Sequence, residues 1–399
     1  MRAAHHVRVL SEIFEVHLLI IAMYGGHDEI PSAEMLACCS SWKRIDASLL
    51  SEPSSSWSFK NWISWRTGRL PREWSGWKLE HKKAVAEYLE ETRCCGIWMF
   101  RFYLLPWIQT WLDEGGIAWM DLDELESKTR ESQAKILLKP EVREEARRMQ
   151  REVKIYRKLE KTFLSRFKRI ITAAPVETER LCNDVGIQSG ETWPNIVSTS
   201  AAKDFASNEE RIEWRLLFIG SLGHFPNREG VRFAAEEILP CLQKQMELPV
   251  VLLVAGAGAA ANRAAFIEFN QIRWLGTVPD VTPVYAKADI VIVPLRAGGG
   301  SRIKILEAFA HGKPVISTRI GAEGLNVVHE RELILADSAE EIAKSCASLL
   351  IDSQKQKLLV TTAHHYVTSQ HSEQILRQKA AALVDDLIPG LPRNKTKNH

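Results

Sequence analysis

A segment near the C-terminus, residues 296–317 (RAGGGSRIKILEAFAHGKPVIS), contains three consecutive glycines, two cations just after them and one acid. Because glycine has no Cβ, the backbone amides of residues 298–300 can approach an anion closely. Arg302 and Lys304 follow in the first turn of a predicted helix, where each adds positive charge beside the exposed amides. The segment therefore predicts a site for a phosphate or diphosphate. A glycine turn that carries two solvated cations is the alternative interpretation.

Glu307 is the acid of this segment, one turn beyond the predicted phosphate site. In a helix it lies beside an apolar stripe of residues spaced three and four apart, and not opposite that stripe. A carboxylate at this position can accept hydrogen bonds from the hydroxyls of a sugar. The alternative is a partly exposed acid that pairs with Lys304 or Lys313.

These residues need a sheet to position them, and the sequence from Trp214 onward predicts one. Short apolar runs rich in Val and Ile alternate with amphipathic stretches, which is typical of parallel strands covered by helices on both faces. Glycine pairs follow RLLFI and VVLLVA, and the glycine triplet follows DIVIVPL. Doubly wound α/β sheets of this kind bind ligands at the carboxyl ends of their strands. The glycine-rich turns are therefore expected at the ligand-binding edge of the sheet.

Composition limits the other choices. The chain has 399 residues, of which 45% are hydrophobic and 26% charged, so two or three folded domains are expected. The formal charge of +2 is too small to indicate nucleic acid by itself. We find no apolar run long enough to span a membrane and no signal-peptide pattern, so we expect a cytoplasmic protein. The seven cysteines lack the spacing of a metal site.

Three stretches carry a resemblance to a known family. Residues 290–325 resemble the donor-site segment of the retaining family 4 glycosyltransferases. Residues 216–240 resemble the first strand, loop and helix of the same domain, and residues 274–295 resemble its loop on the nucleobase side with the following strand. The resemblance implies the GT-B fold, an α/β architecture in which two Rossmann-like doubly wound domains face a cleft. It is much weaker before Trp193.

The resemblance also implies roles for single residues. Glu307 matches the second acid of the family's E-x7-E motif, which is expected to bind the ribose of the nucleotide. Gly299 stands where the first acid would lie, so this motif lacks the carboxylate that usually contacts the transferred sugar. Ser221 and Glu229 stand where the family often has an Arg and a Lys for the donor diphosphate. We expect Arg302 and Lys304 to supply those contacts instead.

The site predicted on these grounds has three parts. The expected catalytic groups are Arg302, Lys304 and Arg101. The residues expected to bind the donor are Gly220, Ser221, Gly223, Gly298, Gly299, Gly300, Ser301, Arg302, Lys304, Ile305, Leu306 and Glu307. The loop expected on the nucleobase side contains Val278, Pro279 and Asp280.

No cofactor is expected beyond the nucleotide-sugar substrate. No metal is expected either, because the positive groups of the protein can neutralise the leaving diphosphate. The run GAGAAAN at residues 256–262 resembles a dinucleotide fingerprint. It lacks the acid that such a site places about twenty residues further on, so a nicotinamide or flavin is not expected.

The first half of the chain is harder to interpret. It begins with an amphipathic helix pattern, whereas the resembled family has a strand and a glycine-containing loop before that helix. We therefore expect an N-terminal domain without its usual first strand, an absence that would expose strand edges. Arg101, Asp121 and Asp123 follow or end apolar runs, so they are expected at the cleft between the domains. An ion pair between Arg101 and an acid of the sheet is the alternative.

The expected domains are an acceptor-side domain at 1–198, a nucleotide-sugar-binding domain at 199–375, and a helix with a tail at 376–399 that packs back toward the first domain. Tryptophans interleaved with cations suit a membrane interface, so we expect peripheral contact with the inner face of the cell membrane. Carbohydrate stacking, a protein contact and simple burial are the alternatives. The tryptophans concerned are Trp57, Trp62, Trp65, Trp74 and Trp77.

The function expected from this resemblance is transfer of a hexosyl group from a nucleotide sugar to a glycan or a lipid-linked acceptor. Transfer would proceed with retention, in the synthesis of cell-surface polysaccharide or glycoconjugate, and no nucleic acid would be involved. A non-catalytic protein that binds a nucleotide sugar or a glycan is one alternative, favoured by Gly299 and the missing strand. A sugar-nucleotide epimerase of similar architecture is another, and it would interconvert free sugar nucleotides without an acceptor.

Overall fold

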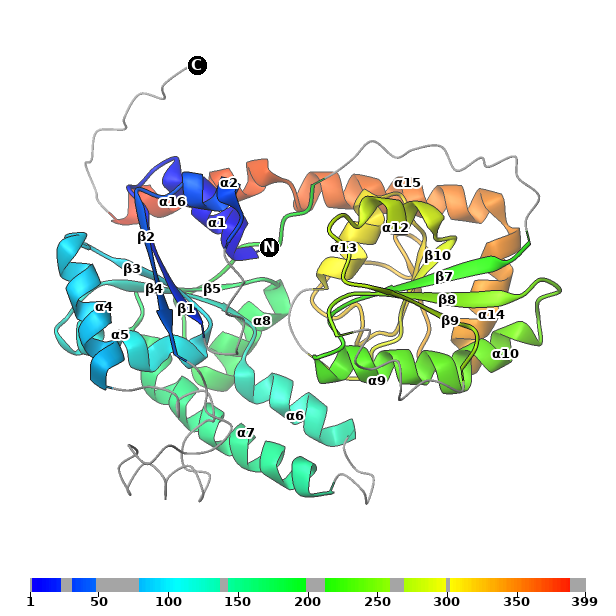
Figure 1. The fold of residues 1–399 in the computed structure, drawn as a ribbon, viewed down its shortest axis with the longest axis horizontal. Helices are drawn as coiled ribbons and strands as arrows, with labels where there is room; N and C mark the ends of the chain where they lie inside the picture. Colours follow the sequence, from blue (N-terminus) through cyan, green and yellow to red (C-terminus); the bar gives the residue numbers. More distant parts are fainter. Residues whose placement is uncertain are drawn as a thin grey trace, which may run out of the picture.

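The computed structural model describes residues 2–22, 31–47, 79–136, 143–198, 212–258, 269–298 and 302–387, which form two α/β units side by side (Figure 1). Among the described helices, none combines the length and the hydropathy that a membrane-spanning segment requires. Some residues that were predicted to contact a membrane or the donor lie outside the described residues. They are Trp57, Trp62, Trp65, Trp74, Trp77, Gly299, Gly300 and Ser301.

Within the described residues, the first half of the chain forms two separate parallel sheets. β1 pairs with β2, and the other sheet has the strand order β3-β4-β5-β6. The amphipathic helix predicted at the start of the chain is confirmed as α1, and the apolar runs next to Arg101 and Asp123 form β3 and β4. The elements are α1 (Arg2–Ser11), β1 (His17–Ala22), α2 (Ala33–Ala37), β2 (Ser41–Asp46), α4 (Leu79–Glu91), β3 (Ile97–Phe100), η2 (Phe102–Leu104), α5 (Leu105–Asp113), β4 (Ala118–Asp123), α6 (Glu126–Ile136), α7 (Arg143–Phe163), η4 (Leu164–Arg166), β5 (Arg169–Thr172), α8 (Pro175–Arg180), η5 (Leu181–Val185) and β6 (Gly190–Thr192).

The second half forms one parallel sheet, which has six strands among the described residues in the order β12-β11-β10-β7-β8-β9. The chain winds outward from β7 in both directions, so β7 and β10 flank the topological switch point at which such sheets bind ligands. The elements are β7 (Trp214–Ile219), α9 (Phe225–Phe233), η6 (Ala234–Ile238), α10 (Leu239–Gln243), β8 (Val250–Ala255), β9 (Ile272–Gly276), α12 (Thr282–Lys287), β10 (Ile290–Val293), α13 (Ile303–Ala310), β11 (Val315–Ser317), β12 (Ile334–Leu335), α14 (Ala339–Ile351), α15 (Ser353–Gln370) and α16 (Glu373–Leu387).

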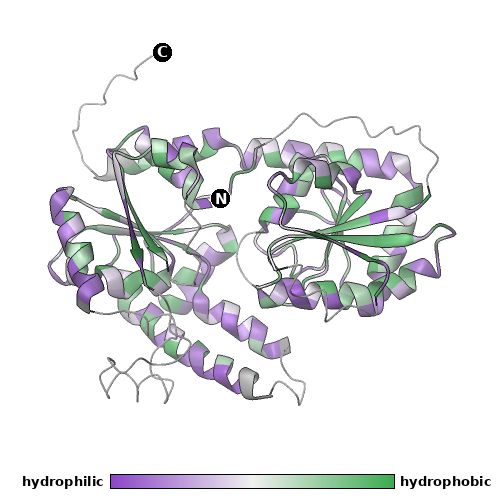
Figure 2. Ribbon diagram, viewed as in Figure 1, coloured by the Kyte–Doolittle hydropathy of each residue, from purple (hydrophilic) through white to green (hydrophobic). Residues whose placement is uncertain are grey.

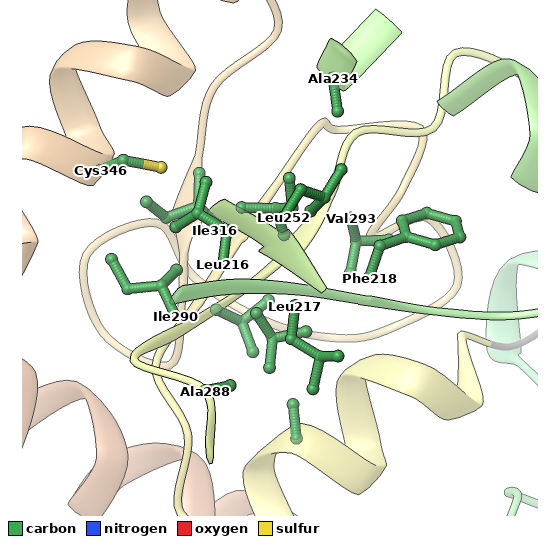
Figure 3. Close-up of a cluster of buried hydrophobic side chains, with 14 of the residues drawn as sticks. Leu216, Leu217, Phe218, Ala234, Leu252, Ala288, Ile290, Val293, Ile316 and Cys346 are labelled. Atoms are coloured by element: carbon green, nitrogen blue, oxygen red, sulfur yellow. The ribbon is translucent and has the colours of Figure 1, made fainter. Parts of the chain in front are cut away.

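The strands predicted from apolar runs in this half are confirmed as β7, β8, β9, β10 and β11. Every residue of β8 and β10 is buried, because helices cover both faces of the sheet. Figure 3 shows the cluster around β7, where Leu216, Leu217 and Phe218 pack against residues of β8, β10 and β11. Full burial of a Leu, Val, Ile or Phe side chain stabilises the fold by about 1.5–3 kcal/mol, so this sheet is a rigid base for the loops at its edge.

Helix α16 packs against the first half of the chain. Leu376, Ala380 and Leu383 share a buried cluster with Val9 of α1 and with Trp193. Ion pairs join the same helices: Arg8 lies 2.5 Å from Glu373, and Arg377 lies 2.9 Å from Glu12. The chain thus connects the two halves through residues 193–198 and again before α16. The exact domain boundaries remain those proposed from the sequence.

Asp121 is buried in β4 and does not lie at the cleft, contrary to the expectation from the sequence. Its carboxylate accepts hydrogen bonds from Nε of Arg2 at 2.9 and 3.0 Å, and Nδ1 of His6 lies 2.9 Å away. Arg2 also donates to the carbonyl of Trp193 at 2.7 Å. Because side chains alternate between the two faces of a strand, β4 directs the Asp121 side chain toward α1. The network of hydrogen bonds and ion pairs therefore connects α1 to the sheet.

This network predicts that the protein loses stability in acid. Burial lowers the pKa of His6 below its ordinary 6.5. Burial raises the pKa of Asp121, but the charge of Arg2 and the contact with His6 outweigh it and hold that pKa below 3.8. The unfolded chain therefore binds more protons than the folded chain as pH falls below 6.5, through His6 first and Asp121 later. The free energy of unfolding should decline by up to about 1.4 kcal/mol per pH unit for each group.

Urea unfolding between pH 7.5 and 4 measures this decline. The His6→Asn variant cannot titrate in this range, so it should lose the part of the slope that begins near pH 6.5. An unchanged slope in that variant would show that other groups cause the acid sensitivity.

Candidate functional site

The predicted donor loops meet at the switch point of the second sheet. Gly220 follows β7 and Gly298 follows β10, and these strands are paired neighbours. Gly298 has a φ of +112°, a conformation that favours glycine. Gly256, at the end of β8, has a φ of +137°, and a Cβ added there would lie 2.2 Å from the carbonyl oxygen of Gly220. Glycine at position 256 therefore lets the turns after β7 and β8 approach each other closely.

Lys304 lies in the first turn of α13 and points toward the Gly220 turn. Its Nζ donates to Oδ1 of Asn227 at 2.7 Å and lies 4.3 Å from the centroid of the Phe218 ring. A Cβ added at Gly220 would come within 3.0 Å of that Nζ, so glycine leaves room for the ammonium. Burial, and after it the charge of Arg302, lowers the pKa of Lys304 to about 7. An anion in the site would compensate this unfavourable charge.

Arg302 is the N-cap residue of α13 and is only 6% exposed. Its Nη2 donates to the carbonyl of Gly298 at 3.0 Å and to the carbonyl of Ile320 at 2.8 Å. Burial lowers its pKa, although Glu124 and Glu323 act in the opposite direction. The alternative of two solvated cations is wrong for this residue, because its guanidinium is buried and holds the glycine loop.

Glu307 follows one turn later in α13, at the position predicted for contact with a sugar. Its Oε2 accepts a hydrogen bond from the hydroxyl of Tyr285 at 3.1 Å. Tyr285 is fully buried and stacks on His311, with ring centroids 4.6 Å apart. Burial raises the pKa of Glu307, while Tyr285 and Lys304 act against the rise. The hydroxyl of Tyr285 therefore holds one oxygen of the Glu307 carboxylate and so fixes the orientation of the carboxylate.

His224 marks the place where cations of both halves converge. It is the N-cap residue of α9, and its amide donates to the carbonyl of Ser221 at 3.2 Å. Desolvation, and after it the charges of Lys304, Arg302 and Arg101, lowers its pKa to about 4. Arg101 belongs to the first half of the chain, so the two halves share one positive field at the start of α9. Such a field, together with a helix N-terminus, is suited to an anion.

Arg101 lies at the carboxyl end of β3, where it was expected. Its Nη2 is 3.0 Å from Asp123 and its Nη1 is 4.0 Å from Glu124. The ion pair with an acid of the sheet, proposed as the alternative, is thus confirmed. Arg101 has a φ of +72° and Asp123 a φ of +61°, conformations that cost about 1–3 kcal/mol each and cluster at functional sites.

Glu124 was not among the residues that the sequence predicted at the site. Burial, and after it the charges of Asp123 and Glu126, raises its pKa to about 7. Its charge also acts on the buried Arg302 of the other half. A carboxyl that exchanges a proton near neutral pH thus faces the candidate donor loop. The cluster of acids in DLDELE was visible in the sequence, but their common burial was not.

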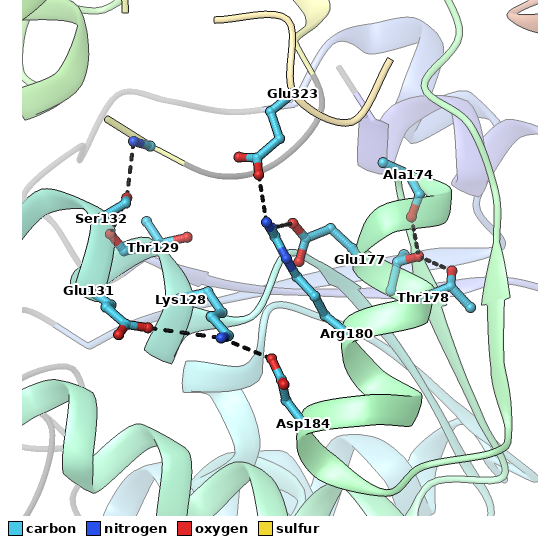
Figure 4. A network of polar contacts seen from close by, with 12 residues as sticks. Lys128, Thr129, Glu131, Ser132, Ala174, Glu177, Thr178, Arg180, Asp184 and Glu323 are labelled. Atoms are coloured by element: carbon cyan, nitrogen blue, oxygen red, sulfur yellow. Dashed lines mark hydrogen bonds and ion pairs between the residues drawn. The ribbon is translucent and has the colours of Figure 1, made fainter. Parts of the chain in front are cut away.

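Contacts between the halves hold the Gly298 loop from the opposite side. The amide of Gly298 donates to Oγ of Ser132 in α6 at 3.1 Å. Arg180 of α8 bridges Glu177, at 2.6 Å, and Glu323 of the second half, at 2.5 Å (Figure 4). The loop that would bind a diphosphate is therefore positioned by both halves.

The other predicted residues lie at the same edge or beneath it. Ser221 and Gly223 are exposed in the turn after β7, whereas Ile305 and Leu306 are buried in the core. Glu229 is paired with Arg296, whose Nε donates to it at 2.8 Å, which explains an acid at this position.

The loop expected on the nucleobase side follows β9. Val278 packs on the core, Pro279 is exposed, and Oδ1 of Asp280 accepts from the amide of Thr282 at 2.9 Å. Among the described residues, no three His, Cys, Asp or Glu side chains are grouped as a metal site would need.

Sequence reasoning missed His224, Asn227 and Arg228, all in the loop and helix start that follow β7. Asn227 holds Lys304, and Nη1 of Arg228 donates to the carbonyl of Leu222 at 3.1 Å. A signal was present, because these residues fall in the GSLGHFPNREG stretch that carried the resemblance.

Comparison with solved structures defines the class of fold. The chain aligns with sucrose-phosphate synthase from Thermosynechococcus elongatus with a TM-score of 0.66 and 17% identity, over 96% of this chain and 91% of that one. It aligns with Anabaena HepE in complex with UDP and glucose with a TM-score of 0.61 and 12% identity, over 93% of this chain and all of that one. The fold is therefore GT-B, as predicted.

The second half of the chain is similar to a known family. Residues 213–352 match the family model described as glycosyl transferases group 1. D-inositol 3-phosphate glycosyltransferase of Corynebacterium diphtheriae is 28% identical over 162 residues, and that of Corynebacterium urealyticum is 24% identical over 188 residues. The matches span 38% and 44% of this chain and 38% and 43% of those relatives. The chain thus has the GT-B fold, and its residues 213–352 are similar to the group 1 glycosyl transferases.

Proposed function

We propose that this protein is a glycosyltransferase that binds a nucleotide sugar at the switch point of its second half and an acceptor against its first half. The observation that carries the proposal is the position of Lys304 and Arg302 against the glycine turns that follow β7 and β10, a region on which the charge of Arg101 also acts. A diphosphate is the group that this arrangement fits best, because its negative charge would be attracted by the cations and by the amides at the starts of α9 and α13. The match of residues 213–352 to group 1 glycosyltransferases supports the same donor class.

In this proposal the chemistry belongs to named groups. Lys304 and the amides at the start of α9 and α13 stabilise the charge that develops on the leaving diphosphate. Arg302 positions the Gly298 loop, and Glu307 accepts hydrogen bonds from the ribose. Transfer proceeds with retention through an oxocarbenium-like state, without a metal. Closure of the two halves over the substrates would exclude water and so favour transfer over hydrolysis.

The first test is nucleotide binding. Glu307→Gln is expected to weaken the binding of the preferred nucleoside diphosphate by about tenfold or more, since a hydrogen bond to a charged group contributes about 1.5–3 kcal/mol. Calorimetry with UDP, GDP, TDP and ADP measures this, beginning with UDP because HepE holds UDP-glucose. Glu340→Gln, an exposed acid of α14, is the matched control and should bind as the wild type does.

The outcomes separate the functions. If Glu307→Gln does not weaken nucleotide binding, the assignment of Glu307 to the ribose is wrong. Donor binding without transfer to any acceptor would favour a non-catalytic binding protein. Interconversion of free sugar nucleotides would favour an epimerase.

A further inference from the structure

A groove of about 900 Å³ runs between α6 and α7, outside the candidate donor site. Its volume falls within the range of sites that bind small molecules. It is lined by Glu131, Ala134, Lys135, Arg147, Gln150, Arg151, Val153, Lys154 and Arg157. Five of these side chains are cationic and one is acidic, so the groove has a strong positive charge.

The spacing of α7 explains this charge. Arg147, Arg151 and Lys154 recur every three or four residues, so they share one exposed face of the helix. The acids Glu152 and Glu160 are turned toward α6 instead: Glu152 lies 3.3 Å from Arg130, and Glu160 accepts from the amide of Ser127 at 2.9 Å. Figure 2 shows hydrophilic residues along the length of both helices.

The acid of the groove does not cancel this field. Glu131 is shared between Arg157, at 3.3 Å, and Lys128, at 3.9 Å. Lys135, Arg147, Arg151 and Lys154 therefore remain in excess over the acids that line the groove. The arginines present planar forks of donors, a geometry that matches the oxygens of phosphate.

The groove lies beside the candidate transfer centre. Ser132, next to Glu131 in α6, accepts from the amide of Gly298 in the predicted donor loop. Ala134, Ala146 and Met149 form a cluster with Phe225, the first residue of α9, which follows His224. At 1.5 Å per residue, Lys135 lies roughly 14 Å from the start of α6 at Glu126, and Glu124 precedes that start.

We propose that this groove binds phosphate groups of the acceptor, so that the acceptor is a phosphate-bearing molecule. The phosphate could belong to a soluble phosphorylated glycan or to a lipid headgroup, and the groove chemistry is the same for both. The acceptor hydroxyl would then lie near Glu124 and Arg101, while its anionic part occupies the groove. This inference rests on the proposed function, because it assigns the groove to the acceptor.

Calorimetry with tripolyphosphate tests the groove while saturating UDP occupies the donor site. The double variant Arg151→Ala/Lys154→Ala should bind tripolyphosphate at least tenfold more weakly and bind UDP as the wild type does. Both side chains are exposed, so the fold should be retained. Lys344→Ala/Lys357→Ala, which removes two exposed cations from α14 and α15, is the matched control and should behave as the wild type.

A second arm identifies the source of the phosphate. Cosedimentation with vesicles of phosphatidylglycerol and phosphatidylcholine, lost in Arg151→Ala/Lys154→Ala and not seen with phosphatidylcholine only, would indicate a lipid headgroup. Tripolyphosphate binding without vesicle binding would indicate a soluble acceptor.

Each failure has a separate meaning. Equal tripolyphosphate affinity in wild type and Arg151→Ala/Lys154→Ala would overturn the groove assignment. Failure of every nucleoside diphosphate to bind would overturn the proposed function and with it the acceptor role, even if tripolyphosphate still bound.

Discussion

Lys304→Met is expected to lower the rate of nucleoside diphosphate release from the sugar nucleotide by about 10²–10³-fold, the usual loss when one preorganised donor to developing charge is removed. The methionine keeps the length of the side chain and its packing on Phe218 but cannot carry charge. Release of the diphosphate from the preferred donor, with and without acceptor, measures the effect. Lys287→Met, at an exposed position of α12, is the control and should retain the wild-type rate.

The pKa of about 7 at Lys304 adds a test that packing could not imitate. The ammonium is fully present below pH 7 and is lost as pH rises through that value. Binding of a diphosphate above pH 7 therefore requires uptake of a proton, and the affinity should fall by up to about tenfold per pH unit. Lys304→Met should bind weakly at all pH values between 6 and 9. A wild-type affinity that is flat over this range would contradict the placement of Lys304 at the diphosphate.

Gly256→Ala is expected to lower the free energy of unfolding by about 4 kcal/mol. Its φ of +137° is a conformation that costs about 1–3 kcal/mol for a residue with a side chain. The added Cβ would also meet the carbonyl oxygen of Gly220 at 2.2 Å, so the β7 and β8 turns would have to separate, at a further cost of about 1–3 kcal/mol. Urea unfolding monitored by circular dichroism measures the change.

Gly276→Ala separates the two causes. Gly276 also has a positive φ, +73°, but a Cβ added there would meet no atom within 4 Å. This variant should lose only the conformational part, about 1 kcal/mol. Equal losses in the two variants would show that the clash between the added Cβ and the carbonyl oxygen of Gly220 contributes nothing to the loss of stability.

Much of the second half could be predicted from the sequence. The runs that became β8 and β10 are apolar at every position, since both faces of a parallel sheet are covered. Glycines at the ends of these runs could be assigned to the ligand edge for the same reason. The position of Glu307 beside the apolar stripe of α13 also followed from helical spacing, although its partner Tyr285 did not.

The first half shows where local patterns end. Asp121 and Asp123 are two residues apart, which in a regular strand would place them on one face. A register irregularity between them in the pairing of β4 with β5 gives them different surroundings: Asp121 joins Arg2 in the interior, and Asp123 pairs with Arg101. A one-residue change in strand register depends on the neighbouring strand, which no local pattern contains.

The sequence by itself determined the α/β class, the order of strands and helices in the second half, and which turns carry glycine, because each depends on side-chain periodicity or on backbone freedom at one position. Only the tertiary structure decided what each charge does. Arg302 and Lys304 are two residues apart, yet the former is buried against the Gly298 loop and the latter faces Asn227. The pKa values of these two side chains depend on burial and on the charges near them, including charges from segments far away in the sequence. Folding determines both, and no local sequence pattern contains them.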